Sequence, residues 1–147
     1  MTIERERQRT HTRVYVPEVV GDLYNLLTAE GTRRDSVSAT DVPFFKYKDV
    51  FLTAACLGFQ LGRREALPKG DKKREIRLDT FHEGDLDILK AIAILEAGSV
   101  EILTDMGTIL EIAETYAYAG VQELERQLVQ NPGKPLWNFL SLIAPSV

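Results

Sequence analysis

The pattern of apolar and polar positions predicts a chain that is mostly helical. Apolar residues over 18–31 recur at spacings of one, three and four, which predicts a helix that ends at Gly31. A second helix is predicted over 44–62, and it becomes apolar on nearly all sides toward its end. We therefore expect the second helix to lie at the centre of the core. Its small residues Ala54, Ala55 and Gly58 would let another helix approach closely.

Helical periodicity continues in the second half of the chain. Thr80 and Glu83 have the spacing of a capping box, which predicts a helix that starts there and ends at Gly98. Gly84 lies in the proposed first turn, so a start at Asp85 is the alternative. Further apolar repeats predict a short helix over 99–103, two helices over 109–116 and 121–128, and a last turn or two over 135–144.

Two short segments, 13–16 and 75–78, alternate apolar and polar residues as half-buried strands do. We expect them to pair with each other. The predicted fold class is mainly α: a compact helical domain of about five to six helices with a minimal two-stranded β element. Residues 1–12 are interpreted as a flexible basic arm, and 13–147 as a single helical domain.

Composition places the chain among soluble globular domains. It has 147 residues, 44% of them hydrophobic, which suits one domain. It has no run of about 18 uncharged apolar residues and starts with a charged segment, so we expect a cytoplasmic protein with no membrane contact.

Charge is distributed unevenly along the chain. Residues 1–77 contain 15 Lys and Arg against 11 Asp and Glu, a net charge of +4. Residues 78–147 contain 3 against 11, a net charge of −8. This asymmetry indicates a basic surface for nucleic acid or an acidic partner, unless the two halves interleave in space.

The sequence offers few groups for catalysis or metal binding. Cys56 is the single cysteine, and its neighbours predict a buried core position. With only His11 and His82 besides, no zinc site of the usual spacing is predicted. The acids and lysine of the segment 85–90 have helical spacing and are interpreted as surface groups. We expect no catalytic residue, no metal and no cofactor.

Most aromatic residues are interpreted as core, because they recur at helical spacing among Leu, Ala and Ile. Tyr118 and Trp137 are the better candidates for a contact between copies, and a homo-oligomer is expected.

Basic side chains are the main candidates for a binding surface. If they share one face, they would neutralise phosphates and bind DNA without sequence preference. The alternative is that they belong to solvated loops. The candidate DNA-binding residues are Arg5, Arg7, Arg9, Arg13, Arg63, Arg64, Lys72, Lys73 and Arg74.

Several segments, taken together, resemble a known family. The segments are "RVYVPE", "YKDVFLTAACLGFQLGRREAL", "IRLDTF", "AIAILEAG", "EIAETYAYAGVQEL" and "PGKPLWNFLSLI". Over about residues 13–143 the chain resembles the small proteins associated with bacterial DNA phosphorothioation (Dnd) gene clusters. These clusters replace a non-bridging phosphate oxygen by sulfur, and companion proteins restrict unmarked DNA as an antiviral defence. The resemblance implies an accessory protein of this modification and restriction system, and no catalytic residue is carried over.

The predicted function is an adaptor that contacts DNA or bridges modification or restriction proteins of the same cluster. One alternative is a ribbon-helix-helix regulator, in which a strand from each of two chains enters the major groove. "TRVYVPEVVGDLYNLL" suits that order, and Arg13 and Tyr15 would then touch base edges. The long loop over 32–43 departs from that compact fold. The other alternative is a protein-protein adaptor without DNA contact, whose acidic half binds a basic partner.

Overall fold

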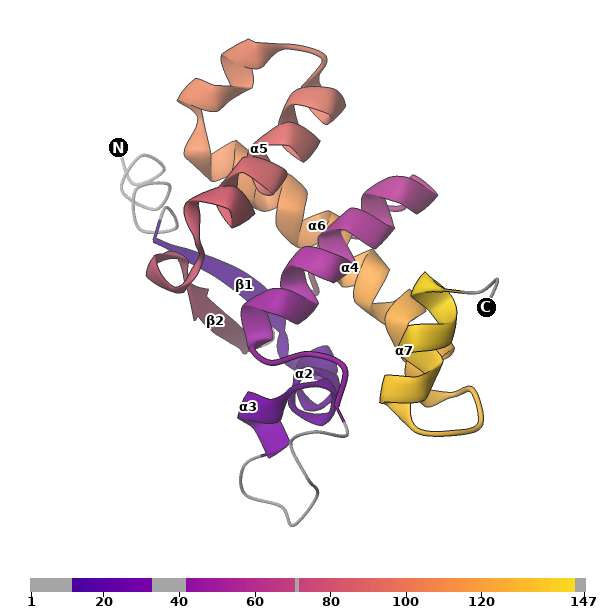
Figure 1. Ribbon diagram of the computed structural model, residues 1–147. Coiled ribbons are helices and arrows are strands. Elements are labelled where there is room, and N and C mark those ends of the chain that lie inside the picture. Colours follow the sequence, from indigo (N-terminus) through magenta and orange to yellow (C-terminus); the bar gives the residue numbers. More distant parts are fainter. Residues whose placement is uncertain (1–11, 33–41, 71, 145–147) are drawn as a thin grey trace.

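The computed structural model describes residues 12–32, 42–70 and 72–144 (Figure 1). The first half contains strand β1 (Arg13–Pro17), the 3-10 helix η1 (Glu18–Val20), α2 (Gly21–Leu27), α3 (Ala29–Thr32), α4 (Tyr47–Leu61) and strand β2 (Lys73–Arg77). The second half contains the 3-10 helix η3 (Leu78–Thr80), α5 (Glu83–Ala97), the 3-10 helix η4 (Val100–Thr104), α6 (Met106–Leu124), the π-helical turn η5 (Glu125–Val129) and α7 (Pro135–Ile143).

The predicted fold class is confirmed. In the described part of the chain, six α-helices surround a core, and the β structure is one two-stranded sheet. The predicted arm over 1–12 lies almost wholly outside the described residues.

Helices α4 and α6 cross at the centre of the fold, as Figure 1 shows. The crossing is close because glycines face the backbone of the other helix. A Cβ on Gly58 would lie 2.1 Å from the carbonyl oxygen of Tyr116, and one on Gly120 would lie 1.8 Å from that of Ala54. Ala54 and Ala55 are fully buried beside them. The prediction that small residues of this helix admit a neighbour is therefore confirmed.

The two predicted strands pair antiparallel, with Val14 opposite Ile76 and Arg13 opposite Arg77. Val14 and Ile76 are buried, so one face of the sheet covers the core. The second strand begins at Lys73, two residues earlier than predicted, because its pairing reaches Pro17 at the end of β1. Lys73 is thus a strand residue and not a loop residue.

The predicted helix over 18–31 is wrong as a single element. Thr28 has extended backbone (φ −122°, ψ 147°) and forms a parallel bridge with Phe44, which separates α2 from α3. Its hydroxyl donates to the carbonyl of Tyr24 at 2.8 Å. Tyr24 is buried, whereas Leu26, assigned to the apolar stripe, is half exposed.

Three further expectations are corrected. The expected capping box of Thr80 and Glu83 is wrong. The start of α5 is capped by Asp85, whose carboxylate accepts the His82 N–H at 2.8 Å. The Thr80 hydroxyl donates to the Arg77 carbonyl. The two helices expected over 109–128 form one continuous element up to η5, because the glycine between them packs against α4. Cys56 is exposed on the solvent side of α4 and not buried.

Candidate interaction surfaces

The candidate DNA-binding residues lie on three parts of the described chain. Arg13 is on β1, Arg63 and Arg64 follow α4, and Lys73 and Arg74 begin β2 directly after Lys72. The first three candidates, Arg5, Arg7 and Arg9, lie outside the described residues.

Arg64 binds groups of its own chain. Its guanidinium donates to Glu96 Oε1 and to Thr115 Oγ1, both at 2.9 Å, and stacks 5.4 Å from the ring centroid of Tyr116. The Tyr116 hydroxyl also donates to Glu96. The hydrogen bond from Tyr116 and the charge of Arg64 lower the pKa of the Glu96 carboxyl. The Arg64 side chain therefore connects the segment after α4 to α5 and α6.

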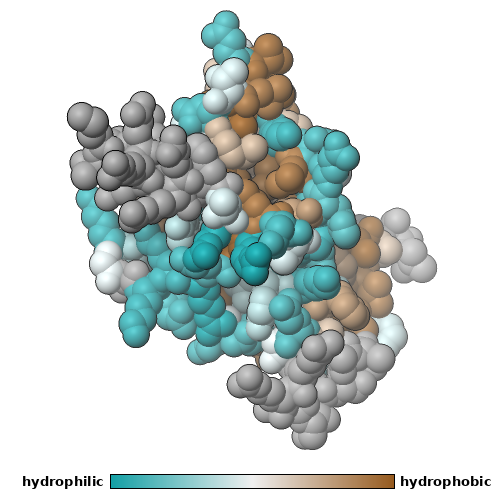
Figure 2. Space-filling view, turned by 90° about the vertical axis from the view of Figure 1, so that its left-hand side faces the viewer, coloured by the Kyte–Doolittle hydropathy of each residue, from teal (hydrophilic) through white to brown (hydrophobic). Residues whose placement is uncertain are grey.

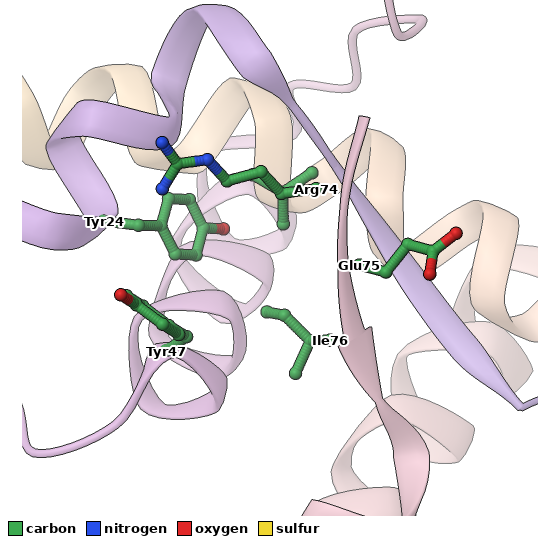
Figure 3. A pocket seen from close by; sticks show the side chains of 6 residues that line it. Tyr24, Tyr47, Arg74, Glu75 and Ile76 are labelled. Carbon is green, nitrogen blue, oxygen red and sulfur yellow. The ribbon is translucent and has the colours of Figure 1, made fainter. Parts of the chain in front are cut away.

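Arg74 is also engaged within the fold. Figure 3 shows its side chain on the same side of β2 as Ile76, opposite to Glu75. Its Nη1 donates to the Gly21 carbonyl and to Asn25 Oδ1, each at 3.2 Å. Its Nη2 lies 3.3 Å from a carboxylate oxygen of Glu18. Arg74 thus connects β2 to α2.

The pocket of Figure 3 is too small for an organic ligand. It is lined by Tyr24, Tyr47 and Arg74 among others, and its volume is about 70 Å³. This volume suits water molecules. Burial raises the pKa of the Tyr24 phenol above its ordinary value.

The outer face of the sheet carries the remaining basic side chains. Residues directly opposite in an antiparallel pair point to the same side, so Arg13, Lys73 and Arg77 share the face away from the core. Arg13 is paired with Glu75, and Arg77 with Asp79. Lys73 Nζ lies 6.0 Å from the ring centroid of Tyr15.

Some candidate cations are not in an ion pair. Among the described residues, Arg63, Lys72 and Lys73 form no ion pair. Of the six candidates that the structure describes, these three therefore keep a charge that could meet a phosphate without breaking an ion pair, although Lys73 would leave its position over the Tyr15 ring.

Glu114 of α6 binds the edge of β1 that does not pair with β2. Its Oε2 accepts the Tyr15 N–H at 2.7 Å. Burial raises the pKa of Glu114 to about 7, although the Tyr15 hydrogen bond and Lys73 act in the opposite direction. Strand β1 is thus bonded within the chain on both edges, by β2 and by Glu114. This arrangement differs from a ribbon shared between two chains and gives the regulator alternative no support.

The turn between α5 and α6 presents apolar side chains to solvent. We call residues 95–105 the tip. Leu95 is 67% exposed, Val100 66% and Leu103 44%. Figure 2 shows apolar side chains at the upper end of the molecule, which this turn forms in Figure 1.

The tip is firmly built. Gly98 has a positive φ of 71° and its N–H donates to the Ile94 carbonyl at 2.8 Å, which ends α5. Ser99 Oγ accepts the Glu101 N–H, and Asp105 Oδ1 accepts the Thr108 N–H, each at 3.1 Å. These caps fix the start of η4 and of α6, so the apolar side chains between them are held in place.

The surroundings of the tip are acidic. Residues 91–111, from the last turns of α5 to the first turns of α6, contain no Lys or Arg and four Asp and Glu. Glu101 is exposed on the tip itself, and Asp105 ends it. Sequence reasoning left Leu95 and Glu96 as alternatives for the apolar face of the helix that ends at Gly98, and it did not find this surface. A signal was available in the sequence, because apolar Val100 and Leu103 follow Gly98 within a stretch that lacks Lys and Arg.

The described residues provide neither a cluster of metal ligands nor a helix that could span a membrane. No three His, Cys, Asp or Glu side chains in this part of the chain are placed to hold a metal ion. None of its helices combines the length and the apolar character needed to cross a bilayer.

Comparison with known proteins gives one finding about family. The protein family described as "DNA sulphur modification system-associated protein 4" matches residues 13–144. No curated protein and no solved structure matches significantly.

Proposed function

The chain belongs to the DNA sulphur modification system-associated protein 4 family, and from this premise we propose that it is an adaptor that binds a protein component of such a system through the tip. The family name supports an accessory role in DNA sulphur modification. The adaptor role is our interpretation of the surface.

The observation that carries this proposal is the rigid, exposed apolar tip with its acidic surroundings. Leu95 and Val100 each expose about two-thirds of their surface, in a turn fixed by capping at both ends. Exposed apolar groups rimmed by polar residues are typical of protein-protein contacts. The acidic surroundings favour a partner whose apolar surface is ringed by Lys and Arg, and they disfavour DNA at this end because carboxylates repel phosphate.

The experiment is co-purification of the full chain with each protein of its own modification and restriction cluster, expressed together. Val100→Asp should abolish retention of one of these proteins. Val19→Asp is the matched control, since Val19 is 67% exposed and lies beside α2, far from the tip. Equal retention by both variants would contradict the proposal.

A second proposed role is non-specific contact with DNA phosphates by the free cations. Arg63, Lys72 and Lys73 support it because they form no ion pair among the described residues. Arg64 and Arg74 are expected to contribute less, since binding would compete with Glu96 and Glu18.

This second role is tested by gel shift with duplex DNA at rising salt. Lys72→Glu with Lys73→Glu should weaken binding, and the affinity of the parent chain should fall steeply between about 50 and 200 mM salt. Absence of any shift at low salt would leave the protein-protein adaptor as the function.

A further inference from the structure

Helix α7 is unusual because it is apolar but covered on only one side. Seven of its nine residues are apolar, and none of the nine is buried. Trp137 is 63% exposed and Ile143 61%, with Leu140 and Leu142 at about two-fifths. A helix that is apolar nearly all round is normally buried. Nothing among the described residues covers these sides of α7, so a further surface is expected to cover them.

The position of α7 is nevertheless fixed. Asn138 Nδ2 donates to the carbonyls of Leu128 at 3.0 Å and Asn131 at 3.3 Å. The ring of Phe139 meets Phe44 edge to face, with centroids 5.0 Å apart. The helix is thus seated on η5 and on Phe44, three residues before the start of α4, and its other sides face solvent in a defined orientation.

An open groove lies beside α7. Its volume is about 640 Å³, and it extends over the solvent side of α4 toward Ile88 of α5. Most of its walls are apolar, with contributions from α4, the end of α6 and α7 itself. Residues that line it include Leu57, Leu61, Leu124, Leu142 and Ile143.

The groove is close to neutral. The single charged residue among its described lining residues is Glu123, and this carboxylate is bound by Arg126 and by Gln127. A partner selected by charge would find little to recognise here. Two identical acidic chains, by contrast, can meet at this face without placing unpaired like charges against each other.

From these observations we propose that α7 and the groove form the contact with a second copy of this chain. The projecting helix and the groove lie on the same surface, so a two-fold axis would place α7 of each copy along the groove of the other. Exposed apolar side chains on the order of 100 Å² each would supply much of the roughly 800 Å² per partner that a stable interface buries. This proposal is independent of the tip.

The test is the mass of the purified full chain in solution by light scattering. The parent chain should have twice the monomer mass of 16.6 kDa. Ile143→Asp should halve that mass, whereas Val100→Asp on the tip should leave it doubled. A parent chain that stays monomeric, or an Ile143→Asp variant that stays dimeric, would overturn the proposal.

A second measurement needs no variant. Cys56 is the single cysteine and lines the groove, so its alkylation rate reports whether the groove is covered. The rate should fall as protein concentration rises over about a hundredfold range, because dimers form by mass action. A rate that is independent of concentration but falls when a protein of the cluster is added would contradict the second copy and identify that protein as the occupant.

Discussion

Gly120 of α6 contacts the backbone of α4 at Ala54 so closely that no side chain fits between them. A Cβ on Gly120 would lie 1.8 Å from the Ala54 carbonyl oxygen and 2.9 Å from the Gly58 nitrogen. Real Cβ atoms do not approach backbone atoms to this degree, so the two helices would have to separate. This contact sets the crossing that orients the tip, at one end of α6, and the groove, near its other end.

Gly120→Ala is therefore expected to destabilise the fold by about 3 kcal/mol, the cost of overpacking against backbone. Gly84→Ala is the matched control, because a Cβ there meets nothing within 4 Å and the residue lies in α5. That variant should be as stable as the parent chain or gain up to about 1 kcal/mol. Urea unfolding measures both. Equal stability of the two variants would show that the close crossing is absent.

Arg74→Ala should lower the free energy of unfolding by about 2 kcal/mol. The substitution removes the hydrogen bonds to Gly21 and Asn25 and leaves both acceptors partly buried. Lys72→Ala, which removes a charge with no ion pair among the described residues, should change stability by less than about 0.5 kcal/mol. Thermal unfolding of the two variants compares a structural cation with a free one, and similar melting temperatures would argue against the role of Arg74.

Glu114 should make stability depend on pH near neutrality. Burial raises its folded-state pKa to about 7, above the ordinary value of 4.5, while Lys73 and the Tyr15 N–H oppose the rise and Glu111 adds to it. The folded chain thus binds this proton more tightly than the unfolded chain does. The stabilisation is complete below about pH 4.5 and is lost as pH rises through about 7, with a total of up to about 3 kcal/mol.

The Glu114→Gln variant isolates this contribution. Its amide oxygen can still accept the Tyr15 N–H, but it does not titrate. Unfolding free energies measured from pH 4.5 to 8 should fall less steeply for the variant than for the parent chain. Parallel curves would mean that the carboxyl of Glu114 is not perturbed by its surroundings.

Lys48 and Asp85 form a partly buried ion pair that joins α4 to α5. The Lys48 side chain is 7% exposed, and its Nζ lies 2.6 Å from Asp85 Oδ2. Burial acts against the charged form of Asp85, but hydrogen bonds from Lys48 and from the His82 N–H lower the pKa of this carboxyl. Stability from the pair is therefore present above the unfolded-state pKa and is lost as pH falls through the lowered pKa in acid.

Asp85→Asn should cost about 3 kcal/mol, because it leaves a buried ammonium with only Asp49 nearby, at 3.8 Å. Adding Lys48→Met should restore much of that loss, since no unpaired charge then remains. A double-mutant cycle by urea unfolding measures the coupling. Additive effects of the two substitutions would indicate that the pair does not form.

Features set by local sequence were predicted well. Gly62 and Gly98 end helices with positive φ, and the alternation over 13–16 identified a strand. The small residues of α4 predicted a close crossing with another helix. The structure was needed to identify that helix as α6.

Features set by distant contacts were not predicted. The break at Thr28 depends on its bridge to Phe44, which local periodicity does not report. Arg64 and Arg74 were expected to face outward, but their carboxylate partners are 32 and 56 positions away in sequence. Cys56 was placed in the core by its small and apolar neighbours, yet it lies on the side of α4 that faces the groove.

The central claim, that the tip binds a protein of the modification or restriction machinery, is tested most directly by photo-crosslinking from a single position of the full chain. A photoreactive residue at Val100, on the tip, should form a covalent adduct with one purified protein of the cluster, and the same residue at Val19 should form none. Adducts of equal yield at both positions, or an adduct at Val19 alone, would contradict the claim.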